Sequence, residues 1–101
     1  MYYTYMLRCE DNSIYTGIAV DIDKRMAEHF SGNNKCAKYT LRHKPVKLEC
    51  FWTSENRSLA SKLEYRIKTL TKEQKEELIE NNNLSDLLGD KIDPEEYFRI
   101  K

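Results

Sequence analysis

The sequence predicts one small α/β domain of the α+β type, in which helices flank a three-stranded antiparallel sheet in the order β-β-α-β-α-α. Three observations predict this class. Two β-rich segments flank a short polar turn, a third alternates apolar with polar residues, and the remainder carries apolar residues at helical spacing. A chain of 101 residues fits one hydrophobic core. We expect the domain to span 1–83 and residues 84–101 to form an acidic C-terminal extension that can be helical.

Two strands joined by a tight turn are predicted at the N-terminus. Residues 2–9 are rich in Tyr, Thr, Met and Leu, residues 10–12 are polar, and strand character resumes over 13–18. Strands separated by so short a turn are expected to pair as an antiparallel hairpin.

A helix over 22–30 and a third strand are predicted next. Asp21 is suited to be the N-cap of the helix, and Gly32 is suited to end it. A polar loop follows from residue 31 to residue 44, and residues 46–53 have the β-branched and aromatic composition of a strand. Its apolar residues occupy alternate positions, at Val46, Leu48, Cys50 and Trp52.

The C-terminal half is predicted to be helical. One helix is expected over 58–70, where an apolar stripe occupies one narrow sector. The stripe consists of Leu59, Leu63, Ile67 and Leu70. Thr71 and Gln74 match a capping box that starts a second helix, which ends at about residue 81. A last short helix is expected where Pro94 follows Asp93.

The three cysteines, Cys9, Cys36 and Cys50, are widely spaced and form no C-x-x-C pair. This pattern predicts reduced thiols in a cytoplasmic protein, not a disulfide framework or a structural zinc site. The N-terminus lacks the basic opening and long apolar stretch of a signal peptide. No run of about 18 apolar residues is present, so no membrane span is expected.

A formal net charge of zero conceals an uneven distribution of charge. Residues 1–70 hold 12 Lys and Arg against 8 Asp and Glu, whereas residues 71–101 hold 5 against 9. A basic segment concentrates polyanions near it, so the charges favour a nucleic-acid partner, although a solvated basic surface also accounts for them. The residues that we expect to contact nucleic acid are Lys24, Lys35, Lys38, Tyr39, Arg42, Lys44 and Lys47.

Three tyrosines and one glutamate are candidates for chemistry. Tyr3 and Tyr5 share a face of the first strand, and a hairpin would bring Tyr15 beside them. Ordinary packing also explains a tyrosine on a strand. Glu64 flanks the apolar stripe of its helix, where a carboxylate needs a partner. That partner can be a divalent cation or an arginine.

Arg25 and His29 are four residues apart and lie on one face of the first predicted helix. An arginine at that position can hold a phosphate through two parallel hydrogen bonds. An ion pair with Glu28 or Asp21 is the structural alternative.

Taken in order, these residues resemble the GIY-YIG nuclease domain, especially its small stand-alone bacterial members. The resemblance covers about residues 2–80. The two signatures match 3–5 and 15–17, and the Lys-Tyr-Thr and Pro-Val-Lys-Leu segments of the small members match 38–40 and 45–48. The matching active-site residues outside these segments are Arg25, His29 and Glu64.

The resemblance implies hydrolysis of a nucleic-acid phosphodiester with one divalent ion, Mg²⁺ or Mn²⁺. Glu64 is the implied metal ligand, and Arg25 neutralises the phosphate. In the implied mechanism, Tyr5 is the candidate to accept the proton of the attacking water, and Tyr15 is expected to orient the water or to substitute for Tyr5. A phenol with a pKa of about 10 is ionised to only about one part in a thousand at pH 7. Either a nearby cation lowers that pKa or His29 relays the proton. The candidates for the cation are Lys24, Lys35 and Lys38.

The sequence therefore predicts a metal-dependent endonuclease of low sequence specificity that acts on nucleic acid, with DNA expected, in repair or processing. Low specificity is expected because members of this size lack a separate DNA-binding domain. One alternative is a binding module that keeps the fold and its basic residues without catalysis. A further alternative is a protein-interaction domain in which residues 84–101 either restrain the basic face or remain solvated.

Overall fold

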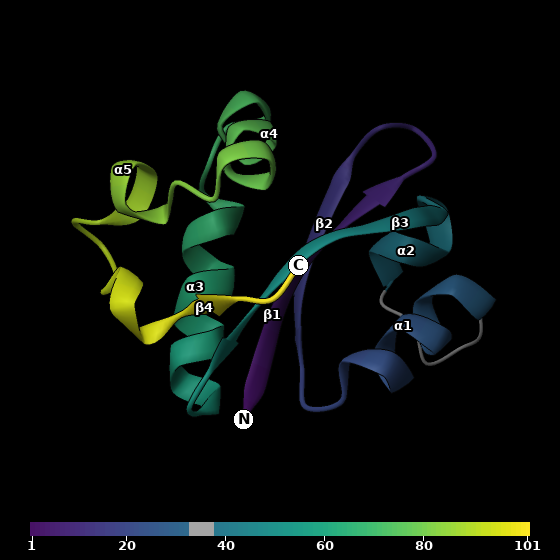
Figure 1. The fold of residues 1–101 in the computed structure, drawn as a ribbon. Helices are drawn as coiled ribbons and strands as arrows, with labels where there is room; N and C mark the ends of the chain where they lie inside the picture. Colours follow the sequence, from purple (N-terminus) through teal and green to yellow (C-terminus); the bar gives the residue numbers. More distant parts are fainter. Residues whose placement is uncertain (33–37) are drawn as a thin grey trace.

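A four-stranded antiparallel sheet forms the centre of the computed structural model, which describes residues 1–32 and 38–101 (Figure 1). The strand order is β2-β1-β3-β4, so β1 is central and β2 is an edge strand. The strands are β1 (Tyr2–Cys9), β2 (Ile14–Ala19), β3 (Pro45–Ser54) and β4 (Phe98–Arg99). The expected antiparallel pairing of the first two strands is confirmed.

Helices cover both faces of the sheet. Two helices lie on one face, and these are α1 (Ile22–Ser31) and α2 (Lys38–Arg42). The other face is covered by a second group (Figure 1). This group consists of α3 (Arg57–Lys68), α4 (Lys72–Asn81), α5 (Leu84–Leu88) and the short 3₁₀ helix η1 (Pro94–Glu96). No helix in the described ranges is both long enough and apolar enough to cross a membrane.

The expectation of three strands is wrong, because β4 adds a fourth at the edge beside β3. Arg99 holds it in place: its guanidinium donates to the carbonyls of Leu78 at 3.0 Å and Ile79 at 2.7 Å, near the end of α4. The Ile100 amide also donates to the Phe51 carbonyl at 3.0 Å. A strand of two residues is too short for its alternation to be read from the sequence.

The helix ends follow the predicted capping. The Asp21 side chain accepts a hydrogen bond from the Lys24 amide at 3.0 Å, and Gly32 ends α1 with φ of 68°. Thr71 and Gln74 form the predicted capping box of α4. The expected continuous loop over 31–44 is wrong, because α2 occupies its second half. Helix was expected within 84–101 without bounds, and there the structure has α5 and, after Asp93, η1. Residues 33–37, and with them Lys35 and Cys36, lie outside the described part of the chain.

Residues 84–101 contribute to the hydrophobic core. The core joins Met6, Cys50 and Trp52 of the sheet to buried residues of α3 and α4. The C-terminal segment adds Leu84, Leu88, Ile92 and Tyr97. The Tyr97 hydroxyl also donates to the Leu59 carbonyl at 2.7 Å. The acidic segment therefore packs beside α3, on the opposite side of the sheet from α1 and α2 (Figure 1).

Not every residue of the predicted apolar face of β3 is buried. Cys50 and Trp52 are buried, but Val46 is 53% exposed. The register between β1 and β3 shifts between Met6 and Leu7 and again near Cys9. These irregularities change which positions of the N-terminal half of β3 face the core. Cys9 and Cys50 are buried free thiols.

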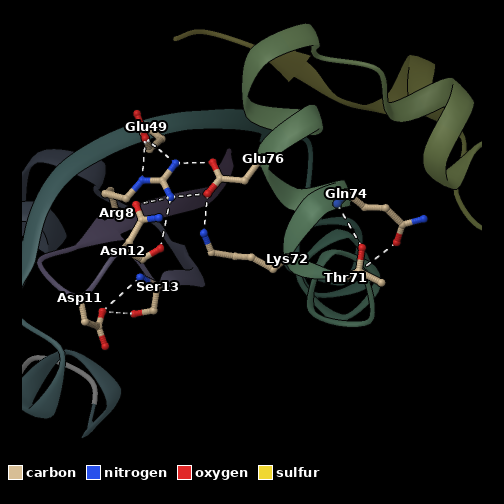
Figure 2. Close-up of polar contacts among 9 residues, drawn as sticks. All are labelled: Arg8, Asp11, Asn12, Ser13, Glu49, Thr71, Lys72, Gln74 and Glu76. Carbon is tan, nitrogen blue, oxygen red and sulfur yellow. Dashed lines mark hydrogen bonds and ion pairs between the residues drawn. The ribbon is translucent and has the colours of Figure 1, made fainter.

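A charged cluster around Arg8 ties the sheet to α4 (Figure 2). The guanidinium donates to Glu49 of β3 at 3.0 Å and forms a two-bond pair with Glu76 of α4. Lys72 also contacts Glu76. The hydrogen bonds from Arg8 lower the pKa of Glu76 to about 2, so this carboxylate remains ionised at neutral pH.

Candidate active site

The register of the hairpin places two tyrosines on one face of the sheet. Tyr5 pairs with Gly17 and Leu7 pairs with Tyr15, so Tyr5 and Tyr15 both face α1. Their ring centroids lie 6.2 Å apart. A Cβ atom at Gly17 would lie 2.5 Å from the Tyr5 hydroxyl and 3.0 Å from Cε2 of Tyr15. Glycine is therefore required at this position to leave room for the Tyr5 phenol.

His29 joins the sheet to both helices on this face. Its Nε2 atom and the Tyr5 hydroxyl are joined by a hydrogen bond of 2.7 Å. Its Nδ1 atom and the Thr40 hydroxyl of α2 are joined by another of 2.9 Å. Tyr5 and His29 are fully buried, and Thr40 is only 3% exposed. The sequence placed His29 at the margin of the core, but the structure places it within the core.

Burial shifts the pKa values of Tyr5 and His29 in opposite directions. It raises the pKa of the Tyr5 phenol, although a hydrogen bond with the Arg25 guanidinium opposes that rise. Burial and the charge of Arg25 lower the pKa of His29 to about 4. At neutral pH the phenol keeps its proton, and the imidazole is neutral and can accept one.

Arg25 is the cation beside the Tyr5 hydroxyl. The sequence analysis had proposed three lysines as candidates for that cation. Its Nη1 atom also lies 2.9 Å from Oε1 of Glu28, one of the two ion pairs considered as structural alternatives. The other alternative, Asp21, is the N-cap of the same helix. The Arg25 side chain is 24% exposed, so an anion from solvent can reach it.

Glu64 approaches this centre from α3, the helix on the other face of the sheet. Its negative charge acts on the Tyr5 phenol and opposes its ionisation. Its Oε2 atom lies 3.4 Å from Nζ of Lys68, and its side chain is 24% exposed. That ammonium also lies 5.8 Å from the ring centroid of Tyr15. Glu64 therefore pairs with Lys68, where the sequence analysis had considered an arginine. This pair lies beside Tyr15 of the edge strand β2.

The predicted nucleic-acid contacts do not all lie beside the tyrosines. Lys24 lines a hollow of about 240 Å³ together with Arg25. Lys38, Tyr39 and Arg42 line another, of about 630 Å³, on α2. Exposed Lys44 follows α2. On β3, Lys47 lies 3.3 Å from a carboxylate oxygen of Glu49.

Thr40, His43 and Asp11 lie near the centre or near Tyr39 and were not assigned a role from the sequence. Thr40 belongs to the Lys-Tyr-Thr segment noted for its resemblance, and that segment was the signal that pointed to it. Tyr39 stacks on Tyr15 with centroids 5.6 Å apart, and on His43 with centroids 4.2 Å apart. Nδ1 of His43 lies 2.5 Å from a carboxylate oxygen of Asp11 in the hairpin turn. Periodicity carries no signal for this last contact, because the two residues are far apart in the sequence.

Known proteins are similar to this chain in sequence and in fold. The model of the GIY-YIG catalytic domain matches residues 1–77. The chain belongs to the GIY-YIG family. A UPF0213 protein of Fusobacterium nucleatum subsp. nucleatum is 54% identical over 78 residues, which cover 77% of this chain and 76% of the relative. A UPF0213 protein of Clostridium perfringens is 44% identical over 87 residues, which cover 85% and 90%.

A GIY-YIG relative of known structure supports the fold. The solution NMR structure of a UPF0213 protein from Bacillus halodurans matches with a TM-score of 0.51 and 38% identity, covering 79% of this chain and 84% of that one. The recognition of a small GIY-YIG member from its motifs is therefore confirmed. The GIY-YIG domain implies a nuclease family whose members generally use a divalent metal, whereas the UPF0213 names specify no reaction.

Proposed function

We propose that this GIY-YIG chain is an endonuclease that hydrolyses phosphodiester bonds of nucleic acid, with DNA as the expected substrate and one divalent ion as cofactor. One observation carries the proposal. A buried hydrogen bond joins Tyr5 to a neutral His29, and the charges of Arg25 and Glu64 both act on the same phenol. The residues proposed as proton acceptor, phosphate ligand and metal ligand thus all act on the Tyr5 phenol, which supports the proposal.

Arg25 is the proposed phosphate ligand. Its guanidinium is partly exposed, and its Nη1 atom lies 2.9 Å from Oε1 of Glu28. A phosphate would present two oxygens to the fork of the guanidinium, and the positive charge would stabilise the charge that develops on those oxygens. Arg25 also hydrogen-bonds the buried Tyr5 phenol, so a phosphate bound to its guanidinium would lie close to Tyr5.

Proton transfer runs from water through Tyr5 to His29 in this proposal. We assign the tautomer in which Nδ1–H of His29 donates to Thr40 and Nε2 accepts from Tyr5, which fits both bond lengths. As the water oxygen bonds to phosphorus, its proton passes to the Tyr5 oxygen and the phenolic proton passes to Nε2. The bond between phosphorus and the leaving sugar oxygen breaks in the same displacement, and that oxygen keeps the electron pair and takes a proton from solvent water. A standing phenolate is disfavoured because burial raises the pKa of Tyr5, so the two transfers occur together. Tyr15, which is partly exposed, orients the water.

Glu64 suits one hard divalent ion, Mg²⁺ or Mn²⁺. Within residues 1–32 and 38–101, no cluster of three or more His, Cys, Asp or Glu side chains could hold a metal. The ion would therefore have Glu64 as its protein ligand, with waters and phosphate oxygens at the remaining positions, as Mg²⁺ commonly does. When bound, the ion would supply charge stabilisation to the phosphate and the leaving oxygen. Glu64 would exchange its contact with Lys68 for the ion.

The proposed path of the nucleic-acid backbone follows the basic residues of α1, α2 and the start of β3. The residues proposed for this role are Lys24, Lys38, Tyr39, Arg42, Lys44 and Lys47, together with Lys35, which lies outside the described part of the chain. Contacts to phosphates carry no sequence information, so binding should be salt-sensitive and of low sequence specificity.

The test is hydrolysis of labelled branched, single-stranded and duplex DNA, and of RNA, with and without Mn²⁺. Glu64→Gln should lower the metal-dependent rate at least about 100-fold, because the ion supplies several kcal/mol of charge stabilisation. Glu80→Gln, which changes an exposed carboxylate on α4, is the matched control and should retain the wild-type rate. Tyr5→Phe should lose hydrolysis but keep its affinity for DNA. Tyr65→Phe, at an exposed tyrosine of α3, should keep both.

The outcomes separate the competing functions. Metal-dependent hydrolysis that survives Glu64→Gln would refute the assignment of the metal ligand. DNA binding without hydrolysis by the wild-type protein on any substrate would show a binding module instead. A fully active Tyr5→Phe would remove Tyr5 from the proton path.

A further inference from the structure

A further hollow lies at the β2 edge and is bordered by Tyr15. It has a volume of about 340 Å³. Its lining comes from β2, α2, α3 and α4, and consists of Ile14, Tyr15, Thr16, Tyr39, Lys68 and Lys75. Neither lysine belongs to the basic segment from which nucleic-acid contacts were predicted.

Positive charge is concentrated in this hollow. Lys75 is partly buried and forms no ion pair with any described residue of the chain. Burial lowers the pKa of Lys75, and the charges of Lys68 and Lys72 act in the same direction. Lys68 pairs with Glu64 and Lys72 pairs with Glu76, but neither carboxylate pairs with Lys75. The ammonium of Lys75 is therefore repelled by both lysines. An anion in the hollow would relieve that repulsion.

Tyrosine side chains form the remaining wall. Tyr15 and Tyr39 are stacked, with an angle of 27° between their ring planes. The buried hydroxyl of Thr16 has no hydrogen-bond partner among the described residues, and Thr16 borders the same hollow. Ammonium groups beside aromatic rings and an unsatisfied hydroxyl fit a nucleotide unit, whose phosphate pairs with cations while its base can stack.

The hollow borders the proposed active centre. Tyr15 belongs to both, and Lys68 lies within 3.4 Å of the Glu64 carboxylate. We propose that this hollow binds the phosphate next to the cleaved one on the same nucleic-acid strand, with Lys75 as its main charge partner and Lys68 as its second. This inference rests on the proposed function, since it uses the Glu64 centre to define where cleavage occurs. It implies that the strand crosses the β2 edge from α1 toward α4.

The experiment measures binding apart from hydrolysis. Fluorescence anisotropy of a labelled single-stranded DNA oligonucleotide, in EDTA over a range of salt concentrations, gives the slope of log K against log[salt]. Loss of one phosphate contact should make that slope shallower by about 0.7 for a single strand. Lys75→Ala should show this shallower slope, whereas Lys75→Arg, which keeps the charge, should keep the wild-type slope. Lys62→Ala removes the same charge from an exposed position of α3 and should leave the slope unchanged.

Each outcome is decisive. An equal slope for Lys75→Ala, Lys62→Ala and the wild-type protein, with matching melting temperatures, overturns the hollow as a phosphate site. If the wild-type protein still hydrolyses DNA in that case, the proposed function stands alone. If Lys75→Ala reduces the slope but the wild-type protein shows no hydrolysis dependent on Glu64, the hollow stands as a binding site and the nuclease proposal fails.

Discussion

Gly17→Ala tests whether the pairing of Tyr5 with glycine holds the active centre together. The new methyl group would lie 2.5 Å from the Tyr5 hydroxyl and 2.7 Å from its Cζ atom. Tyr5 is fully buried, so its ring has no free space into which to move. Overpacking of this kind costs about 1–3 kcal/mol, and losing the hydrogen bond to His29 adds about 1 kcal/mol. For a domain of this size, each kcal/mol lowers the melting temperature by about 4–8 °C.

Gly32→Ala is the matched control. Gly32 has φ of 68°, but a Cβ there would meet no atom within 4 Å. Its cost is therefore backbone strain alone, about 1 kcal/mol. Thermal melts should show both variants destabilised, whereas only Gly17→Ala should lose hydrolysis and perturb the ring signals of Tyr5 and His29 in NMR spectra. A Gly17→Ala protein that melts and cleaves like the wild type would refute the steric argument.

Two further predictions concern stability. Because the pKa of His29 is lowered from 6.5 to about 4, the folded state resists protonation, and stability should fall as pH drops from about 6.5 to 4. At about 1.4 kcal/mol per pKa unit the loss approaches about 3 kcal/mol. Urea titrations at pH 7, 5.5 and 4 should show this loss in the wild type and little of it in His29→Gln, and equal losses in both would count against it. Arg8→Ala should cost about 2–4 kcal/mol, because it leaves the carboxylates of Glu49 and Glu76 without their guanidinium, and Glu49 is only 12% exposed. Chemical denaturation measures this cost, and a loss below about 0.5 kcal/mol would show that water replaces the arginine.

Local patterns predicted most of the secondary structure. The cap at Asp21, the stop at Gly32 and the capping box at Thr71 depend on residues within four positions of one another. The helical stripe containing Leu63 and Ile67 likewise arises within one helix and is buried as expected. The same reasoning missed β4, because two residues carry too little pattern and their pairing partners lie more than 40 positions earlier.

The sequence by itself determined which residue types were available for chemistry, and the resemblance to GIY-YIG members named Tyr5, Tyr15, Arg25, His29 and Glu64 before any geometry was known. Only the tertiary structure decided their states. It buried His29 against Tyr5 and Thr40, which lie 24 and 11 residues away in the sequence, and so lowered its pKa. It also brought Lys68 to the ring of Tyr15. Burial and charge act through space, and no periodicity along the chain reports which distant groups will share one dielectric environment.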